Sequence, residues 1–267
     1  MSPITELAHL TLSPTIPDST IASVLATNTR ALLSRPGCLR VRSSLATSHP
    51  SQQQAEKHLR LFIDWTSLAA HAAFGTDAPA EYAAFRKRFA DIVAPSAGMR
   101  RPFHVFFQEG EVARDDDNAN DNDNEDSDDD YTGASVLDHG AKTQVAELVH
   151  VYYPDHEKTG EEKGRGLQTA RDVAAALAKL ALPGWTGQSA AGWSVERDVL
   201  YQGRPCQVLV MVFGWDSVEA CEKARGGEGF ARVVAPVLGR FGKEKGEKGV
   251  VGMEVCYVSN TTTESSG

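Results

Sequence analysis

The feature that most constrains the fold of this 267-residue chain is a pattern that occurs twice. The segment Glu6–Leu10 (ELAHL) matches Glu147–Val151 (ELVHV), 141 positions further on, and Phe62–Leu68 (FIDWTSL) matches Val212–Val218 (VFGWDSV), 150 positions further on. A Pro-Gly pair recurs between these landmarks and an aromatic segment recurs after them, in the same order. Several landmarks at similar offsets indicate an internal duplication.

A strongly acidic tract separates the two copies. From Glu109 to Asp130 there are twelve acidic residues and one basic residue, Arg114. Asp115–Asp130 has no apolar side chain larger than Ala, so it cannot bury enough surface to offset the entropy of ordering. We therefore expect a disordered acidic linker. The predicted parts are a first repeat over 1–108, the linker over 109–140, a second repeat over 141–258 and a flexible tail over 259–267.

Hydrophobic periodicity predicts the same order of elements in both halves. Ile4–Leu12 and Val145–Tyr153 read as first strands, and the helices Ser19–Leu33 and Leu167–Leu180 follow them, each ending near a Pro-Gly pair. Two more strands, a broken helix and a last strand complete each half. These are Leu39–Ser44, Leu59–Trp65, Ser67–Ile92 and Phe103–Gln108 in the first half, and Trp193–Tyr201, Pro205–Trp215, Ser217–Leu238 and Val250–Val258 in the second.

This order, βαββαβ twice, predicts an α+β fold of two tandem ferredoxin-like repeats. A single such unit covers one face of its sheet with helices and leaves the other face apolar, so that face needs a partner. The second repeat supplies the partner, and we expect an intramolecular dimeric α/β barrel that is monomeric as a pseudo-dimer. About 30 flexible residues reach roughly 30 Å, which is enough to connect the two units.

Composition argues against several classes of function. The acidic tract carries more than the whole net charge of −9, so the remainder is nearly neutral and offers no basic surface for nucleic acid. No apolar run is long enough to span a membrane and no signal peptide is visible, which favours a cytoplasmic protein but leaves unconventional secretion open. The four cysteines lack metal-ligand spacing, and the glycine-rich segments Gly160–Gly166 and Gly226–Gly229 read as loops rather than nucleotide sites.

The residues around both tryptophans resemble the antibiotic biosynthesis monooxygenase family of dimeric α/β barrels. The resemblance rests on Asp64–Ser67 (DWTS) and Gly214–Ser217 (GWDS), and on the Pro-Gly pair before the second strand of each half. It implies oxidation of an activated aromatic or enolisable substrate by O2 without metal or flavin. Relatives degrade haem, isomerise or cyclise their substrates, or have no known activity.

The resemblance also points to site residues. Trp65 and Trp215 match the tryptophan that lines the family's pocket between sheet and helices. The alternative interpretation of each is a large core anchor at the end of a strand. The quinol-oxidising branch has a tyrosine six residues after this tryptophan, where this chain has His71 and Cys221. That branch also has an asparagine four residues before the tryptophan, where this chain has Leu61 and Met211. The positions of the histidine of haem-degrading relatives are Gly75 and Arg225, which argues against haem.

We therefore expect His71 and Trp65 to be catalytic, with the imidazole of His71 accepting a substrate proton near neutral pH. His9 and His150 recur on the first strands of the two halves, as a shared structural contact or as pocket residues. We assign His9 a catalytic role, and His150 a substrate-binding role together with Trp215. His104 is a weaker candidate on the last strand of the first half.

The leading hypothesis is a cofactor-independent monooxygenase that acts with O2 on a small, mostly apolar substrate such as a quinol, a polyketide-like acid or an oxylipin-like acid. It needs no metal, nucleic acid or membrane partner. Two alternatives stay open: a cyclase or isomerase that uses the same pocket without O2, and a non-catalytic binding module whose acidic tract contacts a basic partner.

Overall fold

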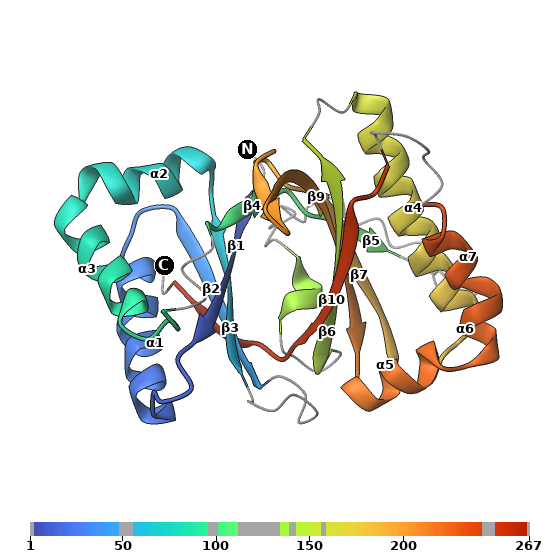
Figure 1. Cartoon of the computed structure of the whole chain (residues 1–267), viewed down its shortest axis with the longest axis horizontal. Helices are drawn as coiled ribbons and strands as arrows, with labels where there is room; N and C mark the ends of the chain where they lie inside the picture. Colours follow the sequence, from blue (N-terminus) through green and yellow to red (C-terminus); the bar gives the residue numbers. More distant parts are fainter. Residues whose placement is uncertain are drawn as a thin grey trace, which may run out of the picture.

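The chain forms two antiparallel β-sheets that face each other, with helices on the outer face of each sheet (Figure 1). This computed structural model describes residues 3–47, 56–95, 101–111, 134–138, 143–155, 159–241 and 249–265. The architecture is α+β and consistent with a ferredoxin-like, dimeric α/β barrel fold.

The elements follow one another in a similar order in the two halves. The first half contains β1 (Ile4–Leu12), α1 (Asp18–Leu33), β2 (Cys38–Thr47), β3 (Lys57–Trp65), α2 (Leu68–Asp77), α3 (Pro79–Ala90), β4 (Phe103–Val105) and β5 (Gln108–Glu111). The second contains η1 (Ser135–Leu137), β6 (Val145–Pro154), α4 (Gly160–Lys179), β7 (Trp185–Trp193), β8 (Val199–Tyr201), β9 (Arg204–Trp215), α5 (Val218–Arg225), α6 (Glu228–Val233), α7 (Ala235–Leu238), β10 (Gly252–Val258) and β11 (Thr261–Glu264).

Each sheet has the strand order of a ferredoxin-like unit and one additional edge strand from the other half. The first sheet runs β11-β2-β3-β1-β4, and the second runs β10-β6-β9-β7-β5 with β8 beside β9. Thus β5 leaves the first half to pair with β7, and β11 leaves the second half to pair with β2. In Figure 1 the red C-terminal segment crosses from one sheet to the other.

These exchanged strands correct two predicted boundaries. Residues 109–111, predicted as the start of the linker, lie in β5, and Val136 and Leu137 near its end are buried in the core. Residues 112–133 and 139–140 of the predicted linker lie outside the described residues. The predicted tail forms β11 instead, because a threonine-rich segment satisfies its backbone hydrogen bonds at the open edge of β2.

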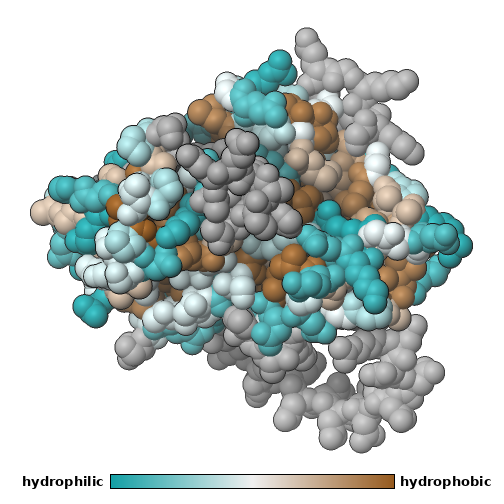
Figure 2. Space-filling view, turned by 60° about the horizontal axis from the view of Figure 1, so that its bottom comes forward, coloured by the Kyte–Doolittle hydropathy of each residue, from teal (hydrophilic) through white to brown (hydrophobic). Residues whose placement is uncertain are grey.

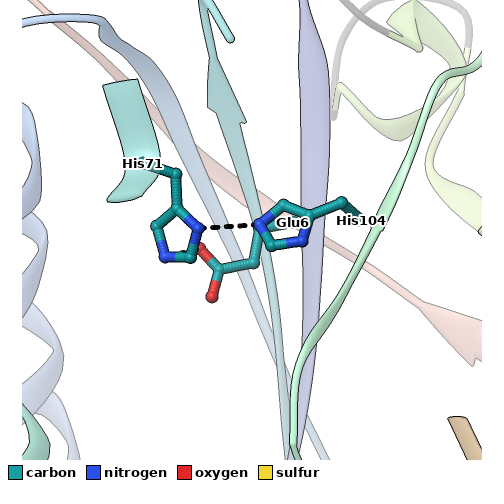
Figure 3. Close-up of side chains that lie close together, drawn as sticks. All are labelled: Glu6, His71 and His104. Carbon is teal, nitrogen blue, oxygen red and sulfur yellow. Dashed lines mark hydrogen bonds and ion pairs between the residues drawn. The ribbon is translucent and has the colours of Figure 1, made fainter. Parts of the chain in front are cut away.

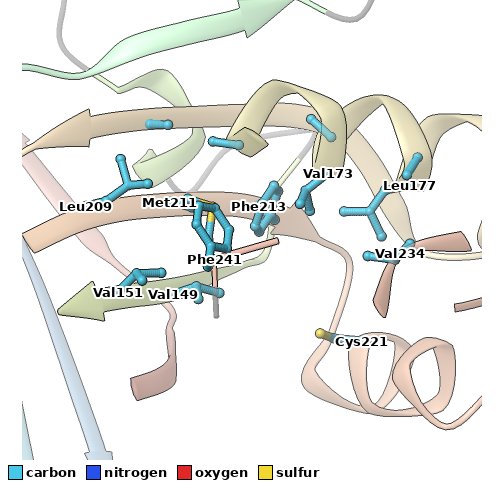
Figure 4. Packing of buried hydrophobic residues seen from close by; sticks show 14 of the residues in the cluster. Val149, Val151, Val173, Leu177, Leu209, Met211, Phe213, Cys221, Val234 and Phe241 are labelled. Carbon is cyan, nitrogen blue, oxygen red and sulfur yellow. The ribbon is translucent and has the colours of Figure 1, made fainter. Parts of the chain in front are cut away.

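Alternation along the central strands builds separate apolar layers on the two faces of each sheet. In β9, Leu209, Met211 and Phe213 face α4 and α5, whereas Val210 and Val212 face the other sheet, so the strand is buried on both sides. Figure 4 shows the helix-facing layer of the second half. The layer between the sheets draws on both halves: its members include Leu7, Phe62, Val105, Leu148, Val210 and Val212.

A buried ion-pair network also joins the halves. The guanidinium of Arg42 on β2 is fully buried and contacts Asp64 Oδ2 at 2.8 Å and Asp138 Oδ1 at 2.6 Å. Asp138 follows η1, so this network fixes the start of the second half against the first sheet. Removing one partner of such a buried pair costs several kcal/mol because a charge is left unpaired.

The same turns and caps occur at matching places in the two halves. Gly37 and Gly184 have φ of +82° and +84°, and their carbonyls accept hydrogen bonds from Thr66 and Asp216 at 2.8 Å in each case. The hydroxyl of Ser67 caps α2 by accepting a hydrogen bond from the backbone N–H of Ala70. The hydroxyl of Ser217 caps α5 by accepting one from the N–H of Ala220, and both distances are 3.1 Å.

Two sequence predictions in the second half were wrong. The strand expected over Trp193–Tyr201 lies earlier, as β7 over Trp185–Trp193, because a run of small residues pairs with β9 despite its low strand propensity. The segment Gly160–Gly166, expected as a loop, is the start of α4: a capping box between Thr159 and Glu162 begins the helix. A Cβ on Gly166 would lie 2.6 Å from the Trp193 ring, which explains that glycine by packing.

The surface mixes hydrophilic and hydrophobic side chains. On the face shown in Figure 2, hydrophobic groups lie in small clusters between hydrophilic ones. Among the helices of the described ranges, none has the length and apolar character that crossing a membrane requires.

Candidate functional site

The candidate site is built on a buried carboxylate and a buried tryptophan of the first sheet. Glu6 on β1 lies beside Ile63 of β3 and His104 of β4 in the strand register, and its side chain faces the helices. Trp65 ends β3, has no exposed surface, and donates from Nε1 to Glu6 Oε2 at 3.1 Å. This hydrogen bond fixes the carboxylate and satisfies the indole N–H.

His71 joins these two residues from α2, one turn after the Ser67 cap. Its Nε2 lies 3.5 Å from Glu6 Oε2, and its ring is 5.1 Å from the Trp65 ring. The side chain of His71 remains 22% exposed, so its ring can be reached from outside the cluster. The structure thus brings together His71 and Trp65, as the sequence predicts.

His104 and Glu196 extend the cluster into a polar chain. Figure 3 shows three of its members, Glu6, His71 and His104. His104 Nε2 lies 2.8 Å from His71 Nδ1, and His104 Nδ1 lies 2.6 Å from Glu196 Oε1. The other oxygen of Glu196 accepts from the backbone N–H of His104 at 2.7 Å. Glu196 lies between β7 and β8, so the second half completes a cluster of the first.

The electrostatics of the cluster favour a neutral His71 at neutral pH. Burial lowers the pKa of His71 below its usual value; Glu6 and Glu196 act in the opposite direction, and His104 adds to the lowering. Burial alone would raise the pKa of Glu196, but the hydrogen bonds from His104 outweigh burial and lower that pKa. An ionised Glu196 therefore makes Nδ1 the donor atom of His104.

This assignment leaves the Nε2 lone pair of His71 ready to accept a proton. In the tautomer in which His71 Nδ1 donates to His104 Nε2, His71 Nε2 faces the Glu6 carboxylate without a proton between them. Proton uptake at His71 Nε2 then creates a cation beside Glu6, which the carboxylate stabilises. The arrangement is that of a general base between the carboxylate of Glu6 and the imidazole of His104, which Glu196 orients.

The cluster also presents a metal-ligand set. One ligand atom from each of Glu6, His71 and His104 lies within 4.8 Å of the others, the only such set of three or more in the described part of the chain. Two imidazoles and one carboxylate are a donor set for zinc or for iron(II).

The matching place in the second half has different chemistry. Trp215 Nε1 donates to Glu147 Oε2 at 3.2 Å, as in the first half. Cys221 takes the place of His71, with its Sγ 3.4 Å from Glu147 Oε2, and Tyr257 takes the place of His104 beside the glutamate. Burial, followed by the charge of Glu147, raises the pKa of Cys221 to about 12, so the thiol stays protonated and is no base.

His9 and His150 do not lie with Trp65 and His71. Their strands place them on the opposite face of the two sheets, where both line a cavity of about 1010 Å³ between the halves. His9 Nε2 lies 3.3 Å from His58 Nδ1, and burial lowers the pKa of His150 to about 4. Glu196 lines the same cavity, so the polar chain ends at its wall. The expected pocket between sheet and helices is thus not where this large cavity lies.

Sequence reasoning missed Glu6 and Glu196 and gave His104 little weight. A signal for Glu6 was present, because a glutamate precedes the repeated Leu-x-His in both first strands, an unusual residue for a buried strand. No signal marked Glu196, which meets His104 across 92 positions of sequence and from the other half.

Comparisons with known proteins find likeness in three-dimensional structure and not in sequence. No family model matches the sequence, and no curated protein sequence matches it. A structure described as an anthrone oxidase-like protein aligns with a TM-score of 0.58 and 13% identity, covering 100% of this chain and 95% of that one. A candidate monooxygenase of Fusobacterium nucleatum aligns with a TM-score of 0.55 and 7% identity over the same shares.

A candidate chlorite dismutase aligns with a TM-score of 0.51 and 7% identity, covering 98% of this chain and 95% of that one. At such identities these likenesses establish the fold alone.

Proposed function

We propose that this protein is a monooxygenase that oxidises a small, mostly apolar substrate with O2, with its reaction centre at Glu6, Trp65, His71, His104 and Glu196. The observation that carries the proposal is the polar chain through His71, a neutral and partly exposed imidazole with a carboxylate partner at each end. The fold shared with an anthrone oxidase-like protein and a candidate monooxygenase supports the reaction class.

The proposed reaction starts with proton transfer to His71. A substrate with an acidic C–H or phenolic O–H loses its proton to Nε2, and Glu6 and His104 stabilise the imidazolium. The resulting enolate or phenolate is electron-rich enough to pass an electron to O2 without a cofactor. For oxidation of a methylene group, one oxygen atom enters the product as a carbonyl and the other leaves as water, with the two hydrogens of the methylene.

We further propose that the two halves arose by tandem duplication and act as the two subunits of a barrel within one monomer. The shared strand order, the paired Pro-Gly turns and the paired serine caps support this. The first half then holds the reaction centre and the second half acts as its structural partner, supplying Glu196.

The experiment is O2 uptake by the purified, metal-stripped protein over a panel of quinols, anthrones and oxylipin-like acids. We expect turnover of at least one substrate, and a drop in kcat of roughly 10² to 10⁴ for His71→Gln. Cys221→Ala, at the matching position of the second half, is the control and should change kcat little. No uptake across the panel, or full activity of His71→Gln, would refute the proposal.

Two further arms separate the alternatives. Product formed equally well without O2 would identify a cyclase or isomerase instead. Loss of activity in His9→Gln and His150→Gln, with His71→Gln active, would move the reaction centre to the cavity between the sheets, which is large enough for a substrate of this size.

A further inference from the structure

The buried carboxylate of Glu6 differs from its counterpart in the other half in how its charge is balanced. Glu147 forms an ion pair between Oε1 and the guanidinium of Arg225 on α5. The matching position of the first half, 150 residues earlier, is Gly75 on α2, which carries no charge. In the described part of the chain, no lysine or arginine forms an ion pair with Glu6.

A buried carboxylate without a cationic partner is costly, and a bound cation would remove that cost. Glu6 is 7% exposed and His104 is 6% exposed, so this is a buried place for a charge. Two imidazole nitrogens lie next to the carboxylate where Arg225 has no counterpart (Figure 3). The first half therefore has ligands for a cation where the second half has an arginine.

We propose that Glu6, His71 and His104 bind one divalent transition-metal ion, with zinc as the simplest occupant. The three ligands come from β1, α2 and β4, so folding of the first half assembles them on three rigid elements. Three protein ligands leave further coordination positions open, as in catalytic rather than structural zinc sites.

The contacts around the three ligands match those that orient metal ligands in proteins. Histidine ligands commonly donate their second N–H to a carboxylate, and His104 does so to Glu196 at 2.6 Å. Trp65 Nε1 donates to Glu6 Oε2 and so fixes the orientation of the carboxylate. His71 Nδ1 and His104 Nε2, now 2.8 Å apart, must separate by about 0.5 Å to bind one ion at zinc–nitrogen distances of about 2.0 to 2.1 Å.

Metal binding and proton uptake compete at His71: an ion on Nδ1 replaces the proton shared with His104, and that proton moves to Nε2, the atom proposed to accept the substrate proton. The ion binds whether or not the protein turns over a substrate, so its test does not depend on the proposed oxygenase activity. If that activity uses His71 as the base, zinc inhibits it. If O2 uptake instead requires added iron(II), the ion is part of the reaction centre.

The test is titration of the metal-free, full-length protein with Co²⁺, followed by the visible absorption bands of bound cobalt, and competition with Zn²⁺ in calorimetry. We expect one ion per chain. The absorption bands should be those of Co²⁺ bound by nitrogen and oxygen ligands in a low-symmetry geometry. Glu6→Gln and His71→Gln should each weaken binding at least tenfold, and Glu196→Gln should weaken it roughly tenfold to a hundredfold by releasing the His104 ring.

His58→Gln is the matched control, because His58 is a partly exposed histidine beside another histidine outside the cluster, and this variant should bind metal as the parent does. Thermal melts establish that each variant folds. His71 lies on a helix surface, so His71→Gln remains informative if Glu6→Gln fails to fold. Absence of stoichiometric binding, or binding unchanged in His71→Gln, would overturn the proposal.

Discussion

Glu196 belongs to the second half of the chain, yet its carboxylate fixes the ring of a histidine in the first half. Its proposed role differs from that of the proposed base, His71, because Glu196 touches His104 and acts on His71 through it. The charge of Glu196 also raises the pKa of His71, against the effect of burial. Replacing Glu196 should therefore change the pH dependence of the reaction as well as its rate.

We predict that Glu196→Gln lowers kcat by roughly 10- to 100-fold with little change in KM. Because the lost charge no longer supports protonated His71, the acid limb of the kcat/KM profile should move to lower pH. Asp198→Asn, which removes an exposed acid paired with Arg101, is the control. An acid limb that stays in place would contradict the assigned role.

A second residue-scale prediction concerns His150 and stability. Its folded-state pKa of about 4 lies below the usual 6.5, so below about pH 6.5 the unfolded state binds a proton that the folded state does not. The free energy of unfolding should fall from pH 6.5 to pH 4, by at most about 3 kcal/mol from this group. Urea unfolding across this range should show a flatter profile for His150→Gln, and parallel profiles would be the contrary result.

The predictable part of the site is the part that local sequence determines. Trp65 ends a strand and His71 lies six positions later in the first turns of a capped helix. Such a short connection keeps the two side chains close in space. The contacts of His104 with Glu196 and His71 depend instead on how sheet edges and helices dock. Sequence periodicity gives the face of a strand but not which loop of the other half covers its edge.

At the scale of elements, the turn before β2 carries a backbone constraint. Gly37 has φ of +82°, and a Cβ there would lie 2.6 Å from both Ala70 Cβ and Thr66 Oγ1. We predict that Gly37→Ala lowers the free energy of unfolding by roughly 1 to 3 kcal/mol, from the left-handed backbone and the contact together.

Gly164→Ala serves as the opposite case, because it lies within α4 with open space around its Cβ position. Alanine favours the helix over glycine by roughly 0.5 to 1 kcal/mol, so this variant should be more stable than the parent. Thermal and urea unfolding measure both changes. Equal effects of the two substitutions would show that backbone conformation does not govern either site.

Strands were predicted correctly where residue propensity and hydrophobic pattern agreed, and wrongly where packing against neighbouring strands determined the structure. β1, β3 and β9 are rich in apolar strand formers and lie close to their predicted ranges. β7 is made largely of small residues that fit beside β9, and Gly192 in it lies where a Cβ would be 2.2 Å from the Phe106 carbonyl oxygen. A run of small residues carries no strand pattern in the sequence, but here such residues permit close approach of strands.

At the scale of the whole molecule, the two halves are interlocked rather than adjacent. The apolar layer between the sheets takes residues from both, Arg42 ties β2 to Asp138, and β5 and β11 each complete the other half's sheet. A duplicated sequence predicts that two units meet, but not that their ends cross over. The crossing follows from unpaired strand edges, which any neighbouring segment of suitable length can satisfy.

Removing the crossing strand tests this interlocking. Deletion of residues 260–267 takes away β11, with its four register pairs to β2, and the buried Asn260, whose Nδ2 donates to the Leu137 carbonyl at 2.8 Å. At about 0.5 to 1.5 kcal/mol for each hydrogen bond, unfolding should become easier by roughly 2 to 4 kcal/mol. Urea unfolding followed by both fluorescence and circular dichroism should show a lower midpoint.

Because the layer between the sheets is shared, the parent should unfold in one transition by both probes. Thr263→Ala, an exposed change within β11, should leave the midpoint nearly unchanged. A truncated protein with the parent's midpoint would mean that β11 adds no stability to the first sheet. Two separate transitions in the parent would mean that the halves fold as independent units, each stable without the apolar surface of the other.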